Sequence, residues 1–394
     1  MIEIAEAQRA LREEGLAGWL LYDFGGLNPI AQQAVAPPGR LLTRRWFCLL
    51  TPQAPPRWLV HAIERASFRG VPGEVRTYAG RRELCAELAA LLRDCPRVAM
   101  EYSPCGHVPA ISRVDAGTVE LVRAAGAEVV SSGDLIQRLL ARWPEEGVHA
   151  HRRAARALED AVRAAWRRIG ERIAAGRPAT ECEVQAWLLQ ALQAAGLESH
   201  APPIVAVGAH AADPHFSPEP ATDAPIAAER LLLIDIWARE PGPAGIYADI
   251  TLMAYTGQEP PARLREVFAV VREARDAALA LVQQRAAAGV PVRGFEADRA
   301  AREVIERAGF GAWFVHRTGH SLGPEDHWLG ANLDDYETHE QRRLLPGTGF
   351  TIEPGIYVPG ELGMRLEIDV FWGADGPQPT TWVQTELECI TAPG

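Results

Sequence analysis

The sequence predicts two domains, an α/β domain over residues 1–145 and an α+β domain over residues 146–394 that is built from two similar halves. Three observations support this division. Short apolar runs typical of strands alternate with helical segments in the first third of the chain. Pro and Gly then punctuate the chain at Ala141–Gly147, where the composition changes. Beyond that boundary, the order of two helices followed by acid-bearing strands occurs twice.

The first domain begins with an amphipathic helix over residues 3–14, which ends at Gly15, a typical helix C-cap residue. Strands and helices then alternate. The expected strands are Gly18–Tyr22, Arg44–Thr51, Arg57–Val60, Val98–Tyr102 and Val129–Ser131, and the expected helices are Arg82–Leu92 and Thr118–Ala125. No Gly-rich phosphate loop follows any of these strands, so nucleotide binding has little support.

The second domain begins with a long, Arg- and Ala-rich helix from His149 to about Ala175. A capping box at residues 180–183 (Thr-Glu-Cys-Glu) begins a second helix, which ends near Gly196. Two further helices, 261–288 and 295–308, begin the second half. The two halves share almost no sequence identity, so the expected duplication is one of architecture.

Charged residues stand inside several of the apolar, strand-like runs of the second domain. An ionised carboxylate buried in a strand is costly unless it is paired, hydrogen-bonded or bound to a metal. Two aspartates and two glutamates occupy such positions, the members of each pair stand 14 positions apart, and a histidine lies between the pairs. In chain order the candidate metal ligands are Asp235, Asp249, His320, Glu353 and Glu367.

Strand alternation indicates whether these acids can face one cavity. In the strand expected around Glu367, Arg365 and Asp369 fall on the same face as the glutamate, and apolar residues fall on the other face. The runs that contain Glu353 and Asp249 likewise place a threonine beside each acid. We therefore expect the polar faces of these strands to be apposed.

The charges of the candidate ligands narrow the choice of cation. Four carboxylates bring about four negative charges into one cavity, and two divalent ions would nearly neutralise them. A carboxylate-rich set with one imidazole favours Mn²⁺, Co²⁺ or Fe²⁺ over a thiolate-type zinc site, and Zn²⁺ stays open. Two metals about 3.5–4 Å apart can stabilise both the attacked and the leaving atoms of a hydrolysed bond.

In this order and context, the five residues resemble the ligands of the M24 metallopeptidase family, which has the pita-bread fold and includes aminopeptidase P, prolidase and methionine aminopeptidase. The resemblance covers the whole chain and implies a creatinase-like N-terminal domain followed by a pita-bread catalytic domain with pseudo-twofold halves. It also implies that Asp235 and Asp249 bind one metal, with Asp249 bridging. His320 and Glu353 would bind the other metal, and Glu367 would bridge both.

The same resemblance implies roles for residues around the ligands. Glu353, in TIEPG, matches the general base, and His327 matches a histidine that stabilises the tetrahedral intermediate. His215, in DPHFSP, matches a histidine of the substrate pocket. His316 matches the first histidine of the HxxGH motif, and Arg365 matches an arginine that supports the site. Taken singly, each histidine could be incidental or only hydrogen-bonded, and the arginine could simply pair with Asp369.

Three departures from the family pattern concern the pocket wall. Trp237 occupies a position where the family usually has glycine, which gives this residue a possible pocket role. The loop before Asp249 is longer than usual, and SLGPEDHW follows His320 in place of a GxGLDVHE-like run. These departures bear on substrate preference more than on hydrolysis.

The resemblance implies a metallopeptidase that binds two metal ions and cleaves Xaa-Pro bonds in small peptides, most simply a dipeptidase of the prolidase type. The near alternative is an Xaa-Pro aminopeptidase that acts on longer peptides. Alternatives of a different class are a creatinase-like amidinohydrolase, which works without metal, and a binding scaffold. An intact ligand set argues against both. The resemblance also implies a homodimer.

Composition restricts the partners of the chain. A net charge of −11 without long runs of like charge weighs against nucleic acid or an anionic membrane as the main partner. The N-terminus lacks signal-peptide features, and no apolar run reaches 18 residues. Six scattered cysteines without a CxxC motif fit a reducing cytoplasm, which is the expected location. His200, His210 and His339 are interpreted as surface residues.

Overall fold

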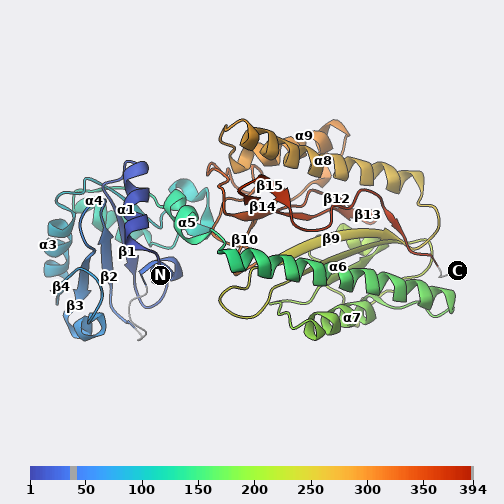
Figure 1. The fold of residues 1–394 in the computed structure, drawn as a ribbon, viewed down its shortest axis with the longest axis horizontal. Helices are drawn as coiled ribbons and strands as arrows, with labels where there is room; N and C mark the ends of the chain where they lie inside the picture. Colours follow the sequence, from blue (N-terminus) through green and yellow to red (C-terminus); the bar gives the residue numbers. More distant parts are fainter. Residues whose placement is uncertain (36–41, 392–394) are drawn as a thin grey trace. The chain divides into compact units, whose positions relative to one another are not determined.

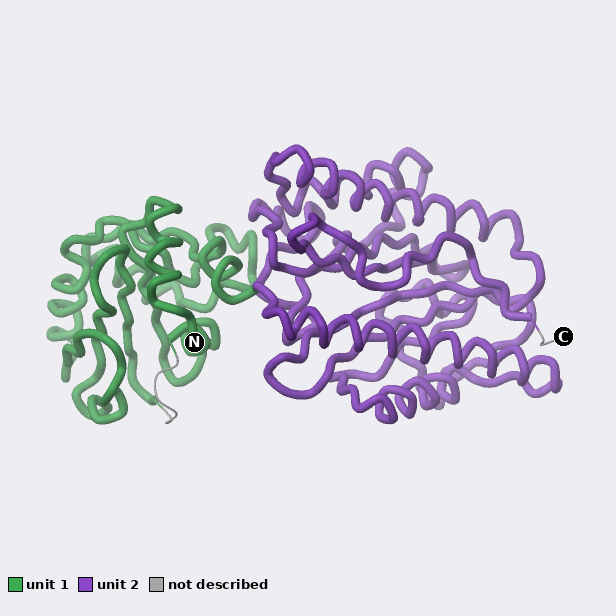
Figure 2. Tube along the Cα trace, viewed as in Figure 1, with its two compact units in different colours: residues 1–141 green, residues 142–394 purple. Residues whose placement is uncertain are grey.

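The computed structural model describes residues 1–35 and 42–391, and the chain divides into two compact units, Met1–Ala141 and Arg142–Gly394 (Figure 2). Each unit has its own sheets and its own apolar core. Among the helices of the described residues, none is both long enough and apolar enough to cross a membrane. The predicted fold class, an α/β domain followed by an α+β domain with two similar halves, is confirmed.

A mixed six-stranded sheet forms the centre of the first unit, with the strand order β4-β3-β2-β1-β5-β6. The strands are β1 (Gly18–Asp23), β2 (Trp46–Leu50), β3 (Arg57–His61), β4 (Glu74–Tyr78), β5 (Arg97–Met100) and β6 (Glu128–Ser131). The helices are α1 (Ile4–Glu13), α2 (Pro29–Val35), α3 (Arg81–Leu92), α4 (Ala116–Ala124) and α5 (Gly133–Leu140), with short 3₁₀ turns at Ala62–Phe68, Pro104–Gly106 and Pro109–Ile111. Leucines of α3 and valines of α4 pack against the sheet.

Three elements of the first unit were not predicted. Strand β4 is an edge strand that pairs only with β3 among the described strands, and most of its side chains are exposed or half-buried. It therefore lacks the apolar run that marks a buried strand. Helices α2 and α5 span seven and eight residues, which is too short for a clear helical period. The segment that precedes α2, FGGLNP, reads locally as a loop.

The second unit contains the order of two helices followed by strands twice. The first half consists of α6 (Glu145–Ala174), α7 (Glu181–Ala194), β7 (Ile204–Val207), a 3₁₀ turn at Gly208–Ala212, β8 (Leu231–Ala238) and β9 (Ala248–Tyr255). The second half consists of α8 (Ala262–Ala287), α9 (Gly294–Arg307), a 3₁₀ turn at Gly311–Trp313, β10 (Ser321–Leu322), β11 (Gly349–Ile352), β12 (Gly355–Val358), β13 (Leu362–Arg365), β14 (Ile368–Gly373), β15 (Gly376–Pro379) and β16 (Glu388–Cys389). The predicted capping box at the start of α7 is present, with Thr180 and Glu183 bonded reciprocally.

The strands of the second unit lie between two pairs of helices, α6 with α7 and α8 with α9 (Figure 1). They form two four-stranded sheets, β16-β9-β8-β7 and β10-β11-β14-β15, and a separate hairpin, β12-β13. Ile234 and Ile236 of β8 belong to the core under α6 and α7, whereas Leu233 belongs to the core with α8 and α9. Because side chains alternate along a strand, Asp235 shares the inner face with Leu233, away from α6 and α7.

The register of β8 with β9 places both aspartates on this inner face. Asp235 pairs with Thr251, and Trp237 pairs with Asp249. Residues that stand opposite each other in an antiparallel pair project to the same side of the sheet. The two aspartates are therefore diagonal neighbours that face the second half of the unit.

Glu353 and Glu367 lie at breaks between strands, and the prediction that each lies inside a strand is wrong. Glu353 follows β11, and Glu367 lies between β13 and β14. At these breaks the backbone bonds to other segments: Glu353 N–H donates to Thr318 O at 2.7 Å, and Glu367 N–H donates to Thr251 O at 3.2 Å. The second bond connects the two halves of the unit beside the inner face of β9.

Candidate metal centre

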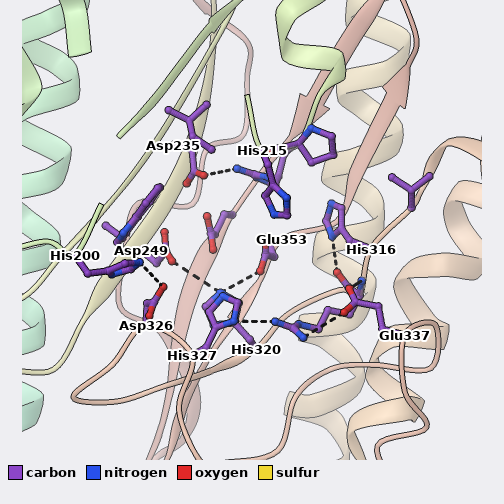
Figure 3. Close-up of a pocket in the computed structure, with 17 residues that line it drawn as sticks. His200, His215, Asp235, Asp249, His316, His320, Asp326, His327, Glu337 and Glu353 are labelled. Atoms are coloured by element: carbon purple, nitrogen blue, oxygen red, sulfur yellow. Dashed lines mark hydrogen bonds and ion pairs between the residues drawn. The ribbon is translucent and has the colours of Figure 1, made fainter. Parts of the chain in front are cut away.

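One cavity of about 720 Å³ in the second unit is lined by all the site residues expected from the sequence (Figure 3). They come from β8, β9 and β13 and from the loops around β7, β10, β11 and β14. The residues are His215, Asp235, Asp249, His316, His320, His327, Glu353, Arg365 and Glu367. Segments more than 130 residues apart in sequence thus meet at a single site.

Thr251 connects the acids of the first half to those of the second. Its hydroxyl oxygen lies 3.1 Å from Asp235 Oδ1 and 2.8 Å from Glu367 Oε2. Arg365 Nε donates to the same oxygen at 2.8 Å, and the Arg365 guanidinium also forms an ion pair with Asp235. One hydroxyl proton can serve only one of the two carboxylates at a time. Asp235 and Glu367 therefore share a single donor on β9.

His320 reaches the acids because the chain before it approaches β11 closely. A Cβ atom at Gly319 would lie 2.1 Å from Thr351 O, so this position accepts only glycine. His320 N–H then donates to Thr351 Oγ1 at 3.0 Å. The ring Nε2 lies 3.3 Å from Glu353 Oε1 and 3.9 Å from Asp249 Oδ2 (Figure 3). The imidazole thus lies between an acid of each half.

The arrangement of donor atoms fits a divalent cation. One ligand atom each from Asp249, His320 and Glu367 lies within 4.8 Å of the other two, and all three residues are buried. Asp249 Oδ1 is buried, and no hydrogen-bond partner for it is found among the described residues. A buried carboxylate oxygen without a partner is costly, and a metal–oxygen bond would satisfy it. His320 Nδ1 faces Ser321 O at 3.5 Å, an orientation that leaves Nε2 as the metal-binding atom.

The pKa values of the acids reflect their burial and mutual repulsion. Burial raises the pKa of Asp249 well above its usual range, and the charges of Glu367 and Asp235 add to the rise. Burial, then the charge of Glu353, raises the pKa of Glu367 in the same way. Burial raises the pKa of Glu353 to about 7 and also raises that of Asp235, although Arg365 opposes both shifts. The four acids resist being ionised at the same time, so cations bound among them would stabilise the charged state.

His316 is a hydrogen-bonded residue of the cavity wall. Its Nδ1 lies 2.7 Å from Arg317 O and its Nε2 lies 2.8 Å from the Tyr357 hydroxyl. Burial, then the charge of Arg365, lowers the pKa of His316 to about 3, so the ring is neutral. Arg365 Nη1 donates to the Tyr357 hydroxyl at 3.3 Å. His316 therefore supports Tyr357, which in turn supports the arginine paired with Asp235.

His327 and His215 occupy more open positions. The ring of His327 lies against that of His320, with centroids 4.0 Å apart and the planes tilted by 33°, and Arg317 Nη2 donates to His327 Nδ1 at 3.0 Å. Desolvation of the ring by the cavity wall, then the charge of Arg317, lowers the pKa of His327. His215 is exposed in the cavity wall, and its backbone N–H donates to Asp213 Oδ1 at 3.0 Å.

Several further residues of the cavity were not assigned to it from the sequence. His200, interpreted as a surface residue, is exposed but lines the cavity, and its Nε2 lies 3.5 Å from Asp326 Oδ2. Arg317 and Glu337 also line the cavity, and Figure 3 shows Glu337 on the side away from His200. These four residues belong to irregular segments without a periodic pattern, so no local signal marks them. Trp237, given a possible pocket role, is part of the wall.

The two similar halves and the acid-rich inner face place the second unit in the class of hydrolases with the pita-bread fold. Residues 149–372 match metallopeptidase family M24. The chain belongs to this family, which confirms the resemblance noted in its sequence.

Relatives within the family are named as dipeptidases. The chain is 34% identical over 259 residues to a probable dipeptidase PepE of Mycobacterium tuberculosis. The aligned residues make up 65% of this chain and 62% of that protein. The chain is 35% identical over 189 residues to an Xaa-Pro dipeptidase of Lactobacillus delbrueckii subsp. lactis, or 48% of this chain and 46% of that protein. The chain thus matches less than two thirds of the length of these curated relatives.

Solved structures resemble the chain over nearly its whole length. The dipeptidase PepE of Mycobacterium ulcerans has a TM-score of 0.68 at 25% identity, covering 98% of this chain and 97% of that one. An Xaa-Pro dipeptidase from Bacillus anthracis has a TM-score of 0.62 at 24% identity, covering 98% and 99%. Both units of the chain therefore have counterparts in single known structures.

Proposed function

We propose that this chain is a dinuclear-metal hydrolase that cleaves Xaa-Pro peptide bonds, most simply in dipeptides. The observation that carries the proposal is the convergence of four carboxylates and one imidazole on a single cavity, all of them buried except the half-buried Glu353. Membership of a metallopeptidase family supports the reaction class. The names of the relatives, dipeptidase and Xaa-Pro dipeptidase, support the substrate class.

In this proposal the inner face of the second unit holds two divalent ions. Asp235, Asp249, His320, Glu353 and Glu367 would be the ligands of these ions. When bound, the ions would supply Lewis acidity, which polarises the scissile carbonyl and lowers the pKa of water so that hydroxide is available as the nucleophile. Mn²⁺ is the preferred candidate because the donor set is rich in carboxylates, with Co²⁺, Fe²⁺ and Zn²⁺ as alternatives.

The residues of the chain manage the protons and the developing charge. Glu353, whose Oε1 lies 3.3 Å from His320 Nε2 in the cavity wall, is the carboxylate suited to accept a proton from the attacking water. It then delivers this proton to the imino nitrogen that leaves. His327 stabilises the oxyanion by donating a hydrogen bond, and His215 contacts the substrate backbone from the more exposed wall. Arg365 and His316 hold the surrounding side chains in place.

A substrate panel tests the proposal. Purified protein loaded with Mn²⁺ is incubated with Xaa-Pro dipeptides, with matched dipeptides that lack proline, and with Xaa-Pro tripeptides. We expect hydrolysis of the proline dipeptides, loss of activity in excess chelator, and about two bound ions per chain. Preference for the tripeptides would indicate the aminopeptidase alternative. Less than one bound ion per chain together with no hydrolysis would indicate a non-peptidase homologue.

The proposal includes a cytoplasmic homodimer that acts on small peptides. Family membership and the composition of the chain support this part. Sedimentation of the metal-loaded protein should give twice the mass of the chain, and a stable monomer would contradict the dimer.

A further inference from the structure

Arg317 contacts two histidines of the cavity at once. Its backbone carbonyl lies 2.7 Å from His316 Nδ1, and its guanidinium Nη2 lies 3.0 Å from His327 Nδ1. A carbonyl can only accept a hydrogen bond, and a guanidinium can only donate one. Neutral His316 therefore carries its proton on Nδ1, and neutral His327 carries its proton on Nε2. One residue imposes opposite tautomers on two rings of the same site.

Glu337 orients the guanidinium of Arg317. Its Oε1 accepts from the Arg317 backbone N–H at 3.2 Å, and its Oε2 lies 3.5 Å from Arg317 Nη1. Glu337 belongs to a turn organised by Asp334, a fully buried residue whose Oδ1 accepts from the Glu337 N–H at 2.9 Å. The arginine is thus held at both its backbone and its side chain by an ordered turn.

The tautomer of His327 decides what the ring presents to the cavity. Because Arg317 occupies Nδ1, Nε2–H is the one N–H donor of the neutral ring. The ring of His327 lies in the cavity wall against that of His320, whose Nε2 faces Asp249 and Glu353, so the donor belongs to the same site as the acids. A developing oxyanion is stabilised by a donor that is already in position. The other tautomer would instead direct the lone pair of Nε2 toward the oxyanion and would not stabilise it.

We infer that Arg317 is a positioning residue that fixes His327 as an Nε2–H donor, and that Glu337 holds the guanidinium in the required orientation. Nothing in this inference requires Arg317 to touch the substrate. Its catalytic consequence rests on the proposed function, but the assignment of the tautomer does not. The two are therefore tested by separate measurements.

The tautomer is tested by nuclear magnetic resonance on protein with ¹⁵N-labelled histidine, at a pH above the usual histidine range. The protein is studied in chelator and again with Zn²⁺, which is diamagnetic. The signals of His327 are identified by their loss in H327Q. We expect the Nε2–H pattern in the parent protein and a shift toward the Nδ1–H form in R317M. R265M is the control, since Arg265 is an exposed arginine that pairs with Glu259 elsewhere in the unit.

Kinetics test the consequence for the reaction. R317M should lower kcat about 10- to 100-fold with little change in KM, which is typical of residues that orient a catalytic group. R317K keeps a donor and should recover part of the loss, E337Q should show a smaller loss, and R265M should show none. If R317M fails to fold, R317K and E337Q still test the inference, because each should have a lower kcat than the parent protein.

Three outcomes would overturn the inference. They are an Nδ1–H pattern for His327 in the parent protein, an unchanged pattern in R317M, and a rise in KM with kcat unchanged, which would indicate direct substrate binding by Arg317. A protein that hydrolyses no peptide but shows the expected tautomers would contradict the proposed function and leave the tautomer assignment intact.

Discussion

The guanidinium of Arg365, at the end of β13, pairs with the carboxylate of Asp235, in the middle of β8. Both side chains are buried, and 130 residues separate them in the sequence. Arg365 also donates to Thr251 on β9, so one arginine of the second half contacts both long strands of the first. It offsets part of the negative charge of the four acids and ties the two halves together at the site.

The substitution R365M should destabilise the metal-free protein by about 3–5 kcal/mol. Removing one partner of a buried ion pair leaves the other charge uncompensated, and here it is Asp235 that would be left. Urea unfolding in the presence of chelator measures the change in the free energy of unfolding. R299M, which breaks an exposed pair with Asp335, should cost less than about 1 kcal/mol. Equal unfolding midpoints for the two variants would contradict the prediction.

The substitution E353Q should lower kcat about 10²- to 10⁴-fold while the fold is retained. Glutamine has nearly the same shape as glutamate but cannot accept and return a proton, which removes general acid–base catalysis. Steady-state kinetics measure the loss, and circular dichroism checks the fold. Turnover close to that of the parent protein would rule out Glu353 as the general base.

The contribution of Glu353 to the stability of the metal-free protein should fall as the pH rises from about 4.5 to about 7, whereas buried neutral histidines such as His316 contribute in the opposite direction. Burial raises the pKa of Glu353 from its usual 4.5 to about 7, so the folded state binds more protons than the unfolded state across this interval. Stability from a raised carboxyl pKa is complete below the unfolded value and is lost as the pH passes the folded value. The raised pKa values of Asp249 and Glu367 act in the same direction.

Thermal unfolding of the parent protein and of E353Q in chelator over this pH range measures the effect, as a decrease in the Tm of the parent relative to that of E353Q. Saturating Mn²⁺ should raise the Tm of the parent at neutral pH, because ions that bind only the folded state stabilise it. A Tm difference that rises steadily between these pH values would contradict the prediction.

The substitution W237A should change the preference for the substrate side chain. Trp237 pairs with Asp249 across the hairpin and lines the cavity, so its removal enlarges the space beside the acids. We expect the ratio of kcat/KM for bulky over small first residues to rise about tenfold, the scale of a pocket contact. W187A is the control, since Trp187 lies on α7 against Arg168. An unchanged ratio in W237A would remove Trp237 from the specificity pocket.

The helices and strands that could be predicted from the sequence are those with a distinct local pattern of residues. Helix α7 was predictable because Thr180 and Glu183 form a capping box at its start, and Gly196 lies just beyond its end. Strand β8 was predictable because a run of apolar residues encloses Asp235. The breaks at Glu353 and Glu367 were not, because their apolar neighbours extend the strand pattern and the bonds that interrupt it come from distant segments.

The same distinction applies to the site. The sequence by itself determined which acids are the candidates, because a carboxylate in an apolar strand needs a compensating partner in any fold. Only the tertiary structure decided the partners: Arg365 pairs with Asp235 rather than with its sequence neighbour Asp369, and Arg317 sets the protonated nitrogen of His327. These contacts depend on distances between segments remote in sequence, and local patterns of hydrophobicity carry no information about such distances.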